Sequence, residues 1–243
     1  IDNRPGSGSN MAGDAAAKSP PDGYTLLHAP DNVFVINPHL YAKMPFDPGK
    51  DLVPIASLIA NQYALAVHPS VPAKNMKEFV EGPGRATPPL FYGSIGNGSP
   101  HHLAMEVLKQ HAKIDLTHVP YRGGGPAAIA MLAGDVSAMF GAAAIVPTIQ
   151  SGPDLPTIHE SYPGYELTVW HARFAPAGTP QAIVDRLRKE VNEVLREPAL
   201  IERLTKSGSG EPYITTPEEF QAKIRGDYET YGKVIKSLGL RIE

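Results

Sequence analysis

The 243-residue sequence contains no cysteine. Thiol catalysis, disulfide bonds and cysteine-ligated metal centres are therefore excluded. It also lacks any run of roughly 18 apolar residues, the length that suggests a membrane-spanning helix. Basic residues are not in excess, because 22 Lys and Arg stand against 25 Asp and Glu, for a formal net charge of −3. We therefore expect no direct membrane insertion and no nucleic-acid partner, since nucleic-acid binders carry a basic stripe.

Motifs of several enzyme classes are missing as well. The chain has no G-x-G-x-x-G dinucleotide fingerprint, no Gly-Lys-Ser/Thr of a P-loop and no H-E-x-x-H zinc motif. Ser94 lacks the G-x-S-x-G spacing of a nucleophile elbow, and no Asp or His partner can be placed convincingly beside it. Paired acids for acid–base catalysis are not evident either.

Four histidines, His101, His102, His111 and His118, invite a metal-site interpretation. The adjacent pair would point to different faces of a helix, so structural or surface roles are favoured over metal ligation. His102 is still a candidate ligand contact, because it lies in the first helical turn beside a glycine-rich loop. We expect no metal and no other cofactor.

What the sequence does contain is typical of a globular α/β protein, with 42% hydrophobic and 19% charged residues. Expected strands and helices alternate, which favours parallel sheets covered by helices. The length allows one large domain or two small ones. Ile1–Gly6 reads like the end of a strand entering a loop, and we expect a preceding segment to be missing.

The most informative stretch is Phe91–Leu103, which predicts a strand, a loop of Gly, Ser and Asn, and the start of a helix. Free backbone N–H groups and the positive end of a helix dipole make such a turn a ready anion site. A tight strand-to-helix turn would explain the glycines equally well. A second loop of the same design, Tyr121–Gly125, favours the binding interpretation, because parallel strands bring both loops to one sheet edge.

Two side chains of the second loop could add donors. Tyr121 could supply a phenol and Arg122 a guanidinium to a carboxylate. The alternative is that Tyr121 packs against the core and Arg122 faces water. We favour Tyr121 as a contact over Arg122, and Asp31 is the one acid that we place at the ligand edge of a sheet.

The other elements are predicted from apolar periodicity, turn residues and caps. The sequence predicts strands at Tyr24–Leu27, Ile55–Ile59, Tyr63–His68, Leu116–Val119, Val136–Phe140 and Leu167–Phe174. It predicts helices at Met11–Lys18, Lys74–Val80, Pro100–Ala112, Ala127–Ala133 and Ala143–Gln150, one capped by Thr179–Pro180 and ending at Leu195, and one after the Thr216 capping box.

A set of short motifs occurs in a characteristic order: Asn3–Gly6, Pro21–Leu27, Ile36–Tyr41, Val67–Pro72, Gly96–Ser99 with His102 and Leu103, His118–Gly123, and Phe174–Pro180. With these motifs the chain resembles, almost from end to end, the substrate-binding proteins of tripartite tricarboxylate transporters, the Bug receptors. It departs from them in lacking an initial strand with a Pro-Gly-Gly loop and in having a short Ser151–Asp154 segment. Gly141–Ala142 also replaces the Asp-Asn of many members, which weakens the case for an amino-acid ligand.

The resemblance implies an α/β protein of periplasmic-binding-protein type II, a two-lobed Venus flytrap with two mixed, mostly parallel sheets flanked by helices. Lobe one is expected from residues 1–73 and 168–243, without its N-terminal strand–helix unit, and lobe two from residues 74–167. Ligand binding is expected to close the cleft by rotation about two crossing strands.

The resemblance also implies how the ligand is held, by loop amides, helix N-termini and hydroxyls. Carried onto this chain, the ligand-binding positions of lobe two are Ser94, Gly96, Asn97, Gly98, Ser99, His102, Tyr121 and Gly123. The ends of other strands, at Ala29, Asp31, Gly141, Ala142 and Trp170, are expected to complete the pocket.

The implied function is that of a periplasmic solute-binding receptor rather than an enzyme. It is expected to be an exported monomer, its signal peptide absent from this chain, that captures a small carboxylate and delivers it to the membrane components of a tripartite tricarboxylate transporter. The alternatives are a small α/β transferase or hydrolase that uses the glycine loops as an anion cradle, and a ligand sensor that signals to a membrane partner.

Overall fold

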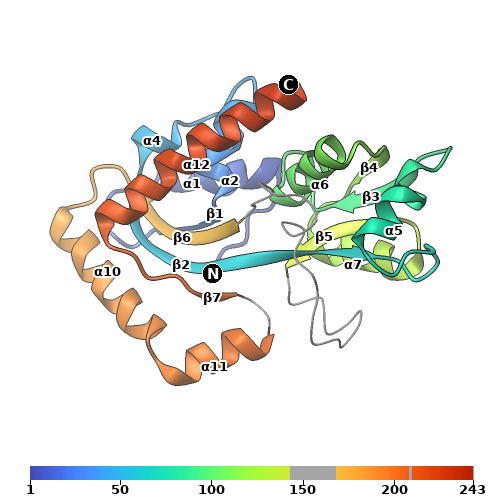
Figure 1. The fold of residues 1–243 in the computed structure, drawn as a ribbon. Coiled ribbons are helices and arrows are strands. Elements are labelled where there is room, and N and C mark those ends of the chain that lie inside the picture. The colour runs from blue at the N-terminus through green and yellow to red at the C-terminus, as the bar shows by residue number, and fades with distance from the viewer. Residues whose placement is uncertain (143–167, 208–209, 243) are drawn as a thin grey trace. The chain divides into compact units, whose positions relative to one another are not determined.

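The computed structural model describes residues 1–142, 168–207 and 210–242, which form two compact units (Figure 1). Unit 1 comprises Ile1–Asn61 and Val169–Glu243, and unit 2 comprises Gln62–Thr168. The first crossing between the units therefore lies inside a strand, at Asn61–Gln62, whereas the expected boundary between the lobes was between residues 73 and 74. The helix expected at residues 143–150 and the Ser151–Asp154 segment lie outside the described residues.

The strand that carries this crossing is β2, Leu52–Val67, a single strand of 16 residues (Figure 1). The prediction of two strands, Ile55–Ile59 and Tyr63–His68, was wrong. The intervening Ala60–Gln62 are not strong strand formers, but β7 pairs with Ile59 and Ala60 while β5 pairs with Tyr63 onward. Partners on both sides of the weak stretch keep the backbone extended.

Unit 1 is built on β1 (Leu27–Pro30), β6 (Thr168–Pro176), the first half of β2 and β7 (Glu211–Pro212). β6 lies between β1 and β2, and the pairs β1–β6 and β2–β7 are antiparallel. The helices of unit 1 are η1 (Ser7–Ser9), α1 (Asn10–Ala17), α2 (Asn32–Val35), α3 (Asn37–Leu40), α4 (Pro48–Asp51), α10 (Gln181–Leu195), α11 (Pro198–Ser207) and α12 (Pro217–Leu238).

The first strand begins later than predicted, at Leu27 rather than Tyr24. Tyr24 is 93% exposed, so it contributes nothing to a core. The strand instead extends to Pro30, opposite His171 of β6. A proline without an N–H is tolerated there because β1 is an edge strand.

Helices cover both faces of the unit 1 sheet. On one face Val184 of α10 packs with Ile55 and Ala175, and Leu187 and Val191 extend that contact. On the other face the rings of Phe34 and Phe174 stack with centroids 3.9 Å apart, and the long helix α12 packs against α2 and α3. Thr179 does not cap α10 as predicted, because its hydroxyl donates to the Pro176 carbonyl.

Unit 2 contains the second half of β2 with β5 (Ala138–Ala142), β3 (Leu90–Ser94) and β4 (Leu116–Pro120), in that order. β3 pairs in parallel with both β4 and β5, and β2 pairs antiparallel to β5. Its helices are α5 (Met76–Glu81), η2 (Pro83–Arg85), α6 (Pro100–Ala112) and α7 (Gly124–Ala133). The predicted class, α/β with mixed sheets flanked by helices, is confirmed.

The C-terminal helix α12 begins with the capping box predicted at Thr216. The Thr216 hydroxyl accepts a hydrogen bond from the Glu219 amide, and the Glu219 carboxylate accepts one from the Thr216 amide, at 3.2 and 2.8 Å. Two amides of the first turn are therefore satisfied.

We predict that Thr216→Ala lowers the free energy of unfolding by about 1 kcal/mol, because one cap acceptor is lost. For a chain of this size that corresponds to a fall in Tm of about 2–4 °C, measurable by circular dichroism. Thr230→Ala on the same helix is the control, since the Thr230 hydroxyl donates only to the Gly226 carbonyl one turn earlier. Equal losses in the two variants would contradict a specific role for the cap.

Candidate functional site

The strand registers of unit 2 bring three predicted segments to one sheet edge. Ser94 at the end of β3 lies opposite Pro120 of β4, so the loops that follow both strands start side by side. The Tyr121 amide donates to the Ser94 carbonyl at 2.9 Å and ties the loops together. β5 runs in the same direction and ends at Ala142, so Gly141 and Ala142 reach the same edge.

The first loop, Ser94–Ser99, is held by hydrogen bonds of its own. The Gly96 amide donates to the Ser94 hydroxyl at 3.1 Å, and that hydroxyl lies 3.1 Å from the Gly96 carbonyl oxygen. Gly96 has φ 134°, a conformation that favours glycine. Asn97 is exposed and makes no hydrogen bond with any described residue.

The loop ends in the predicted start of α6. Ser99 is the N-cap, and its hydroxyl accepts from the His102 amide at 3.3 Å. The His102 ring returns to the loop, since its Nδ1 accepts from the Gly98 amide at 3.1 Å. His102 was correctly expected beside the loop, and its role there is to hold the backbone.

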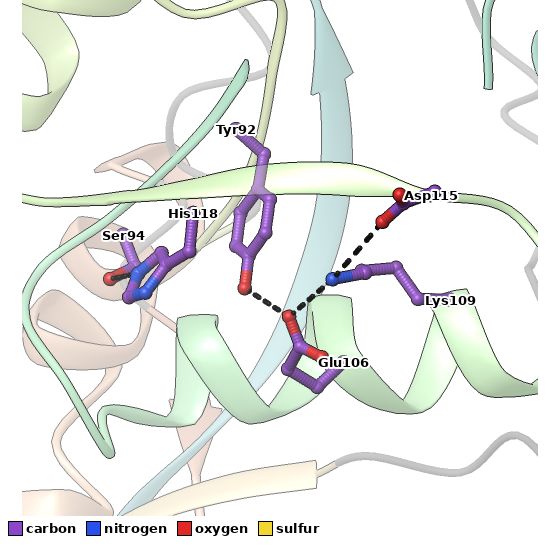
Figure 2. A network of polar contacts seen from close by, with 6 residues as sticks. All are labelled: Tyr92, Ser94, Glu106, Lys109, Asp115 and His118. Atoms are coloured by element: carbon purple, nitrogen blue, oxygen red, sulfur yellow. Dashed lines mark hydrogen bonds and ion pairs between the residues drawn. The ribbon is translucent and has the colours of Figure 1, made fainter. Parts of the chain in front are cut away.

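A polar network lies behind the loop on the α6 side of the sheet (Figure 2). His118 Nε2 is 2.7 Å from the Ser94 hydroxyl. Next to it the Tyr92 hydroxyl donates to Glu106 at 2.6 Å, and Lys109 binds the same carboxylate oxygen at 2.9 Å. The ammonium group of Lys109 also lies 5.7 Å from the centroid of the Tyr92 ring.

This environment disfavours charge on the imidazoles. Burial, followed by the neighbouring His102 and Lys109, lowers the pKa of His118 from 6.5 to about 3. Burial also lowers the pKa of His102, and Glu106 opposes that shift. Both rings are therefore neutral at physiological pH. Burial and the bond to Glu106 raise the pKa of Tyr92, which remains a hydrogen-bond donor.

The second loop leads into α7, whose N-cap is Gly123 and which has no side-chain cap. A methyl group built on Gly123, Gly124 or Gly125 would meet no atom within 4 Å, so this helix start borders open space. The amides of the first helical turn consequently remain available to an anion. Tyr121 is half-buried and packs against the core of unit 2, while Arg122 is exposed and makes no ion pair with the described residues.

The predicted contacts of unit 1 are buried within that unit. Ala29, Asp31 and Trp170 all have 0% exposure, and the Asp31 amide donates to the Trp170 carbonyl at 2.9 Å. Trp170 Nε1 donates to Asp227 at 2.8 Å. Neither carboxylate oxygen of Asp31 has a hydrogen-bond partner among the described residues, and burial, with Asp227 next, raises its pKa well above the usual value.

A separate groove of about 560 Å³ lies in unit 1, beside α12. Its lining includes Phe34, Met44, Phe46, Ile224 and Tyr228. None of the predicted ligand-binding residues lines it, so it is distinct from the candidate site.

Sequence reasoning missed two residues of the unit 2 edge. His118 had been assigned a structural or surface role, and no partner was expected for Ser94. Tyr63 was read only as part of a strand, yet it lies opposite Ala142 and its hydroxyl is 3.4 Å from His101 Nδ1. The contact between His118 and Ser94 could have been found only from the β3–β4 register, which sets Tyr92 opposite His118.

The arrangement supplies hydrogen-bond donors rather than reactive groups. Ser94 with His118 resembles a nucleophile and its base, but Ser94 has 0% exposure and a histidine with a pKa of about 3 is a weak base. Within residues 1–142, 168–207 and 210–242, no cluster of three potential metal ligands occurs. No helix in these same ranges is long and apolar enough to cross a membrane.

Comparison with known proteins identifies the family of the chain. A profile of the tripartite tricarboxylate transporter family receptors matches residues 1–240. The chain belongs to this family. It is accordingly a solute-binding receptor, and the transferase or hydrolase alternative finds no support.

Three solved structures show the same fold. Rpa4515 of R. palustris, solved with adipate, is 29% identical with a TM-score of 0.92, over 99% of this chain and 86% of that one. The periplasmic binding protein BugD is 26% identical with a TM-score of 0.88, over 100% and 87%. MatC of Rhodopseudomonas palustris, with bound malate, is 27% identical with a TM-score of 0.83, over 95% and 85%. The predicted type II binding-protein fold is thereby confirmed.

The neutral histidines of unit 2 predict a sensitivity to acid. Because the pKa of His118 is about 3 in the folded chain and ordinarily 6.5, the unfolded chain binds more protons as pH falls below 6.5. Stability is therefore lost progressively from about pH 6.5 towards pH 3. We predict that His118→Gln, which lacks this group, loses less stability than the wild type between pH 7 and pH 4.5, measured by urea unfolding.

Asp31 acts with the opposite sign, because its raised pKa makes the folded chain bind a proton that the unfolded chain releases. Asp31→Asn should therefore lose more stability than the wild type over the same interval. Parallel pH profiles for all three proteins would contradict both assignments.

Proposed function

We propose that this receptor captures a small carboxylate on the two glycine loops of unit 2 and delivers it to the membrane components of a tripartite tricarboxylate transporter in the periplasm. The observation that carries the proposal is the exposed pair of loops with unsatisfied amides at one sheet edge. Of the predicted ligand positions, the proposed contacts at this edge are Gly96, Asn97, Gly98, Tyr121, Gly123, Gly141 and Ala142. Ser94, Ser99 and His102 hold the first loop from behind. Ala29, Asp31 and Trp170 are buried within unit 1 and are not proposed as contacts.

The donors suit a carboxylate. Asn97 in the first loop, and Gly124 and Gly125 at the uncapped start of α7, offer amides without acceptors among the described residues. The exposed guanidinium of Arg122 adds a positive charge beside them. A carboxylate bound there would accept several charge-assisted hydrogen bonds.

The relatives favour a dicarboxylate. Two solved structures of similar proteins contain adipate and malate, and both molecules carry two carboxylates. Two donor-rich loops at one edge match that chemistry. The periplasmic location is supported by the likeness to the periplasmic binding protein BugD.

The proposal is tested with a ligand panel of adipate, malate, a monocarboxylate and the uncharged diamide of adipate. We predict that at least one carboxylate raises Tm by several degrees through mass action, whereas the diamide does not. Isothermal titration then measures Kd for each compound that shifts Tm. If only uncharged compounds stabilise the protein, the carboxylate assignment fails.

A methyl group placed at the uncapped N-terminus of α7 provides a sharper test. Gly124→Ala adds a side chain in open space, where no atom of the protein lies within 4 Å, and alanine is the better helix former. We predict that Tm is unchanged or slightly higher, while the affinity for the carboxylate falls about tenfold or more, about 1.4 kcal/mol, because the methyl hinders its approach.

Gly226→Ala is the matched control for this substitution. Gly226 lies inside α12 and also has no atom within 4 Å of the added methyl group. It should raise stability in the same way and leave Kd at the wild-type value. Equal Kd values for Gly124→Ala and the wild type would show that the N-terminus of α7 is not part of the binding site.

A further inference from the structure

Two stacked imidazoles hold the Ser94–Ser99 loop from behind. The rings of His102 and His118 have centroids 4.0 Å apart and planes within 8° of parallel. Tyr92 extends the stack, with its ring centroid 4.8 Å from that of His118 (Figure 2). Each imidazole contacts a different half of the loop, so the stack couples the two halves.

The His118 half is held through the Ser94 hydroxyl. This oxygen has three neighbours, the Gly96 amide at 3.1 Å, the Gly96 carbonyl at 3.1 Å and His118 Nε2 at 2.7 Å. A hydroxyl has one hydrogen to donate and two lone pairs to accept with. All three contacts are satisfied together when the hydroxyl donates to the Gly96 carbonyl and accepts from two N–H groups. These are the Gly96 amide and the Nε2–H of the neutral His118 ring. Ser94 then has no capacity left for a ligand.

The His102 half is held through the Gly98 amide. Because that N–H donates to His102 Nδ1, the proton of the neutral ring is on Nε2. The Gly98 amide thus donates directly to a ring of the stack, and the Gly96 amide donates to the Ser94 hydroxyl, which contacts the other imidazole. Asn97, between them, retains a free amide within the described chain.

We propose that His118 is a positioning residue of the carboxylate site: it fixes the Ser94 hydroxyl and supports the His102 ring, so that the Asn97 amide is presented to the ligand in one orientation. This inference rests on the proposed function, because it assigns the loop to carboxylate binding. In this arrangement His118 and Ser94 act through the loop backbone and do not touch the ligand.

The surroundings of His118 disfavour a positive charge on its ring. His118 is faced by Tyr92 from β3, by His102 and Lys109 from α6, and through Tyr92 by Glu106. A positive charge on His118 would lie against His102 and near the Lys109 ammonium. The ring therefore contributes geometry and no positive charge, and the affinity for a carboxylate should not fall between pH 6 and pH 8, as it would if a histidine cation bound the ligand.

Two substitutions separate the contacts of His118. His118→Phe keeps a ring for the stack and removes the bond to Ser94. His118→Gln places an amide N–H near the position of Nε2 and removes the ring. His118→Phe should disorder the Ser94–Gly96 half of the loop. His118→Gln should keep this half ordered, because its amide can still donate to Ser94.

His68→Phe is the matched control. His68 Nδ1 is 2.7 Å from the Ser70 hydroxyl, the same distance as in the Ser94–His118 pair. His68 follows Val67, which lies opposite Ala138 at the start of β5, whereas the candidate site lies at the end of β5. The His68→Phe substitution therefore removes a comparable hydrogen bond from the opposite edge of the same sheet.

The first measurement needs no ligand. In the ligand-free protein, amide hydrogen exchange at Gly96, followed by NMR, should accelerate about tenfold in His118→Phe, because the acceptor for this amide is no longer fixed. His118→Gln and His68→Phe should exchange at the wild-type rate. An unchanged Gly96 rate in His118→Phe would overturn the proposal.

The second measurement is the Kd for adipate and for malate by calorimetry from pH 6 to pH 8. His118→Phe should bind about tenfold more weakly with a flat pH profile, and His118→Gln should recover to within about threefold of the wild type. Wild-type affinity in His118→Phe, or a fall of wild-type affinity through pH 6.5, would overturn the positioning role. If the wild type binds neither acid, the proposed function fails for these ligands while Gly96 exchange still decides the role of His118.

Discussion

The parallel pairing of β3 with β4 is the constraint on which the candidate site depends. It sets Ser94 beside Pro120, so that the two glycine loops leave the sheet at adjacent positions, and the Tyr121 amide bonded to the Ser94 carbonyl locks that arrangement. The same register sets Tyr92 opposite His118. Side chains alternate between sheet faces, so the polar network forms on the α6 face while α7 packs on the other.

The two units solve the problem of buried polar groups in different ways. In unit 2 the polar atoms behind the loop form two hydrogen-bonded groups, Ser94 with His118 and Tyr92 with Glu106 and Lys109. The stacked rings of Tyr92 and His118 bring the two groups together. In unit 1 the Asp31 carboxyl is fully buried with no partner among the described residues, and Asp227 is paired with Trp170 and Lys223. The hydrogen bonds of unit 2 fix the geometry of the loop, whereas burial of Asp31 disfavours its charged form and raises its pKa.

A receptor needs a site that binds anions tightly without reacting with them. The two loops supply amides and an uncapped helix start, which are suited to an anion, and they present no accessible nucleophile. In the Ser94–His118 pair, which elsewhere could be catalytic, Ser94 is fully buried, and we assign the pair to holding the backbone. This division between exposed donors and buried supports explains why the family relation to solute-binding receptors agrees with the geometry.

The sequence by itself predicted the alternation of strands and helices in unit 2, the glycine loops, the cap of α12 and the family, because these depend on local residue chemistry and on short motifs. It did not predict α4, α11 or β7. It could not determine that β2 is one strand, since pairing with β5 and β7 outweighs the weak propensity of Ala60–Gln62. Nor could it find His118 as the partner of Ser94, because the two are 24 residues apart and meet only through the strand register. Tertiary structure therefore decided which side chains support the loop, whereas local sequence predicted the glycine loop itself, a type of turn that suits an anion.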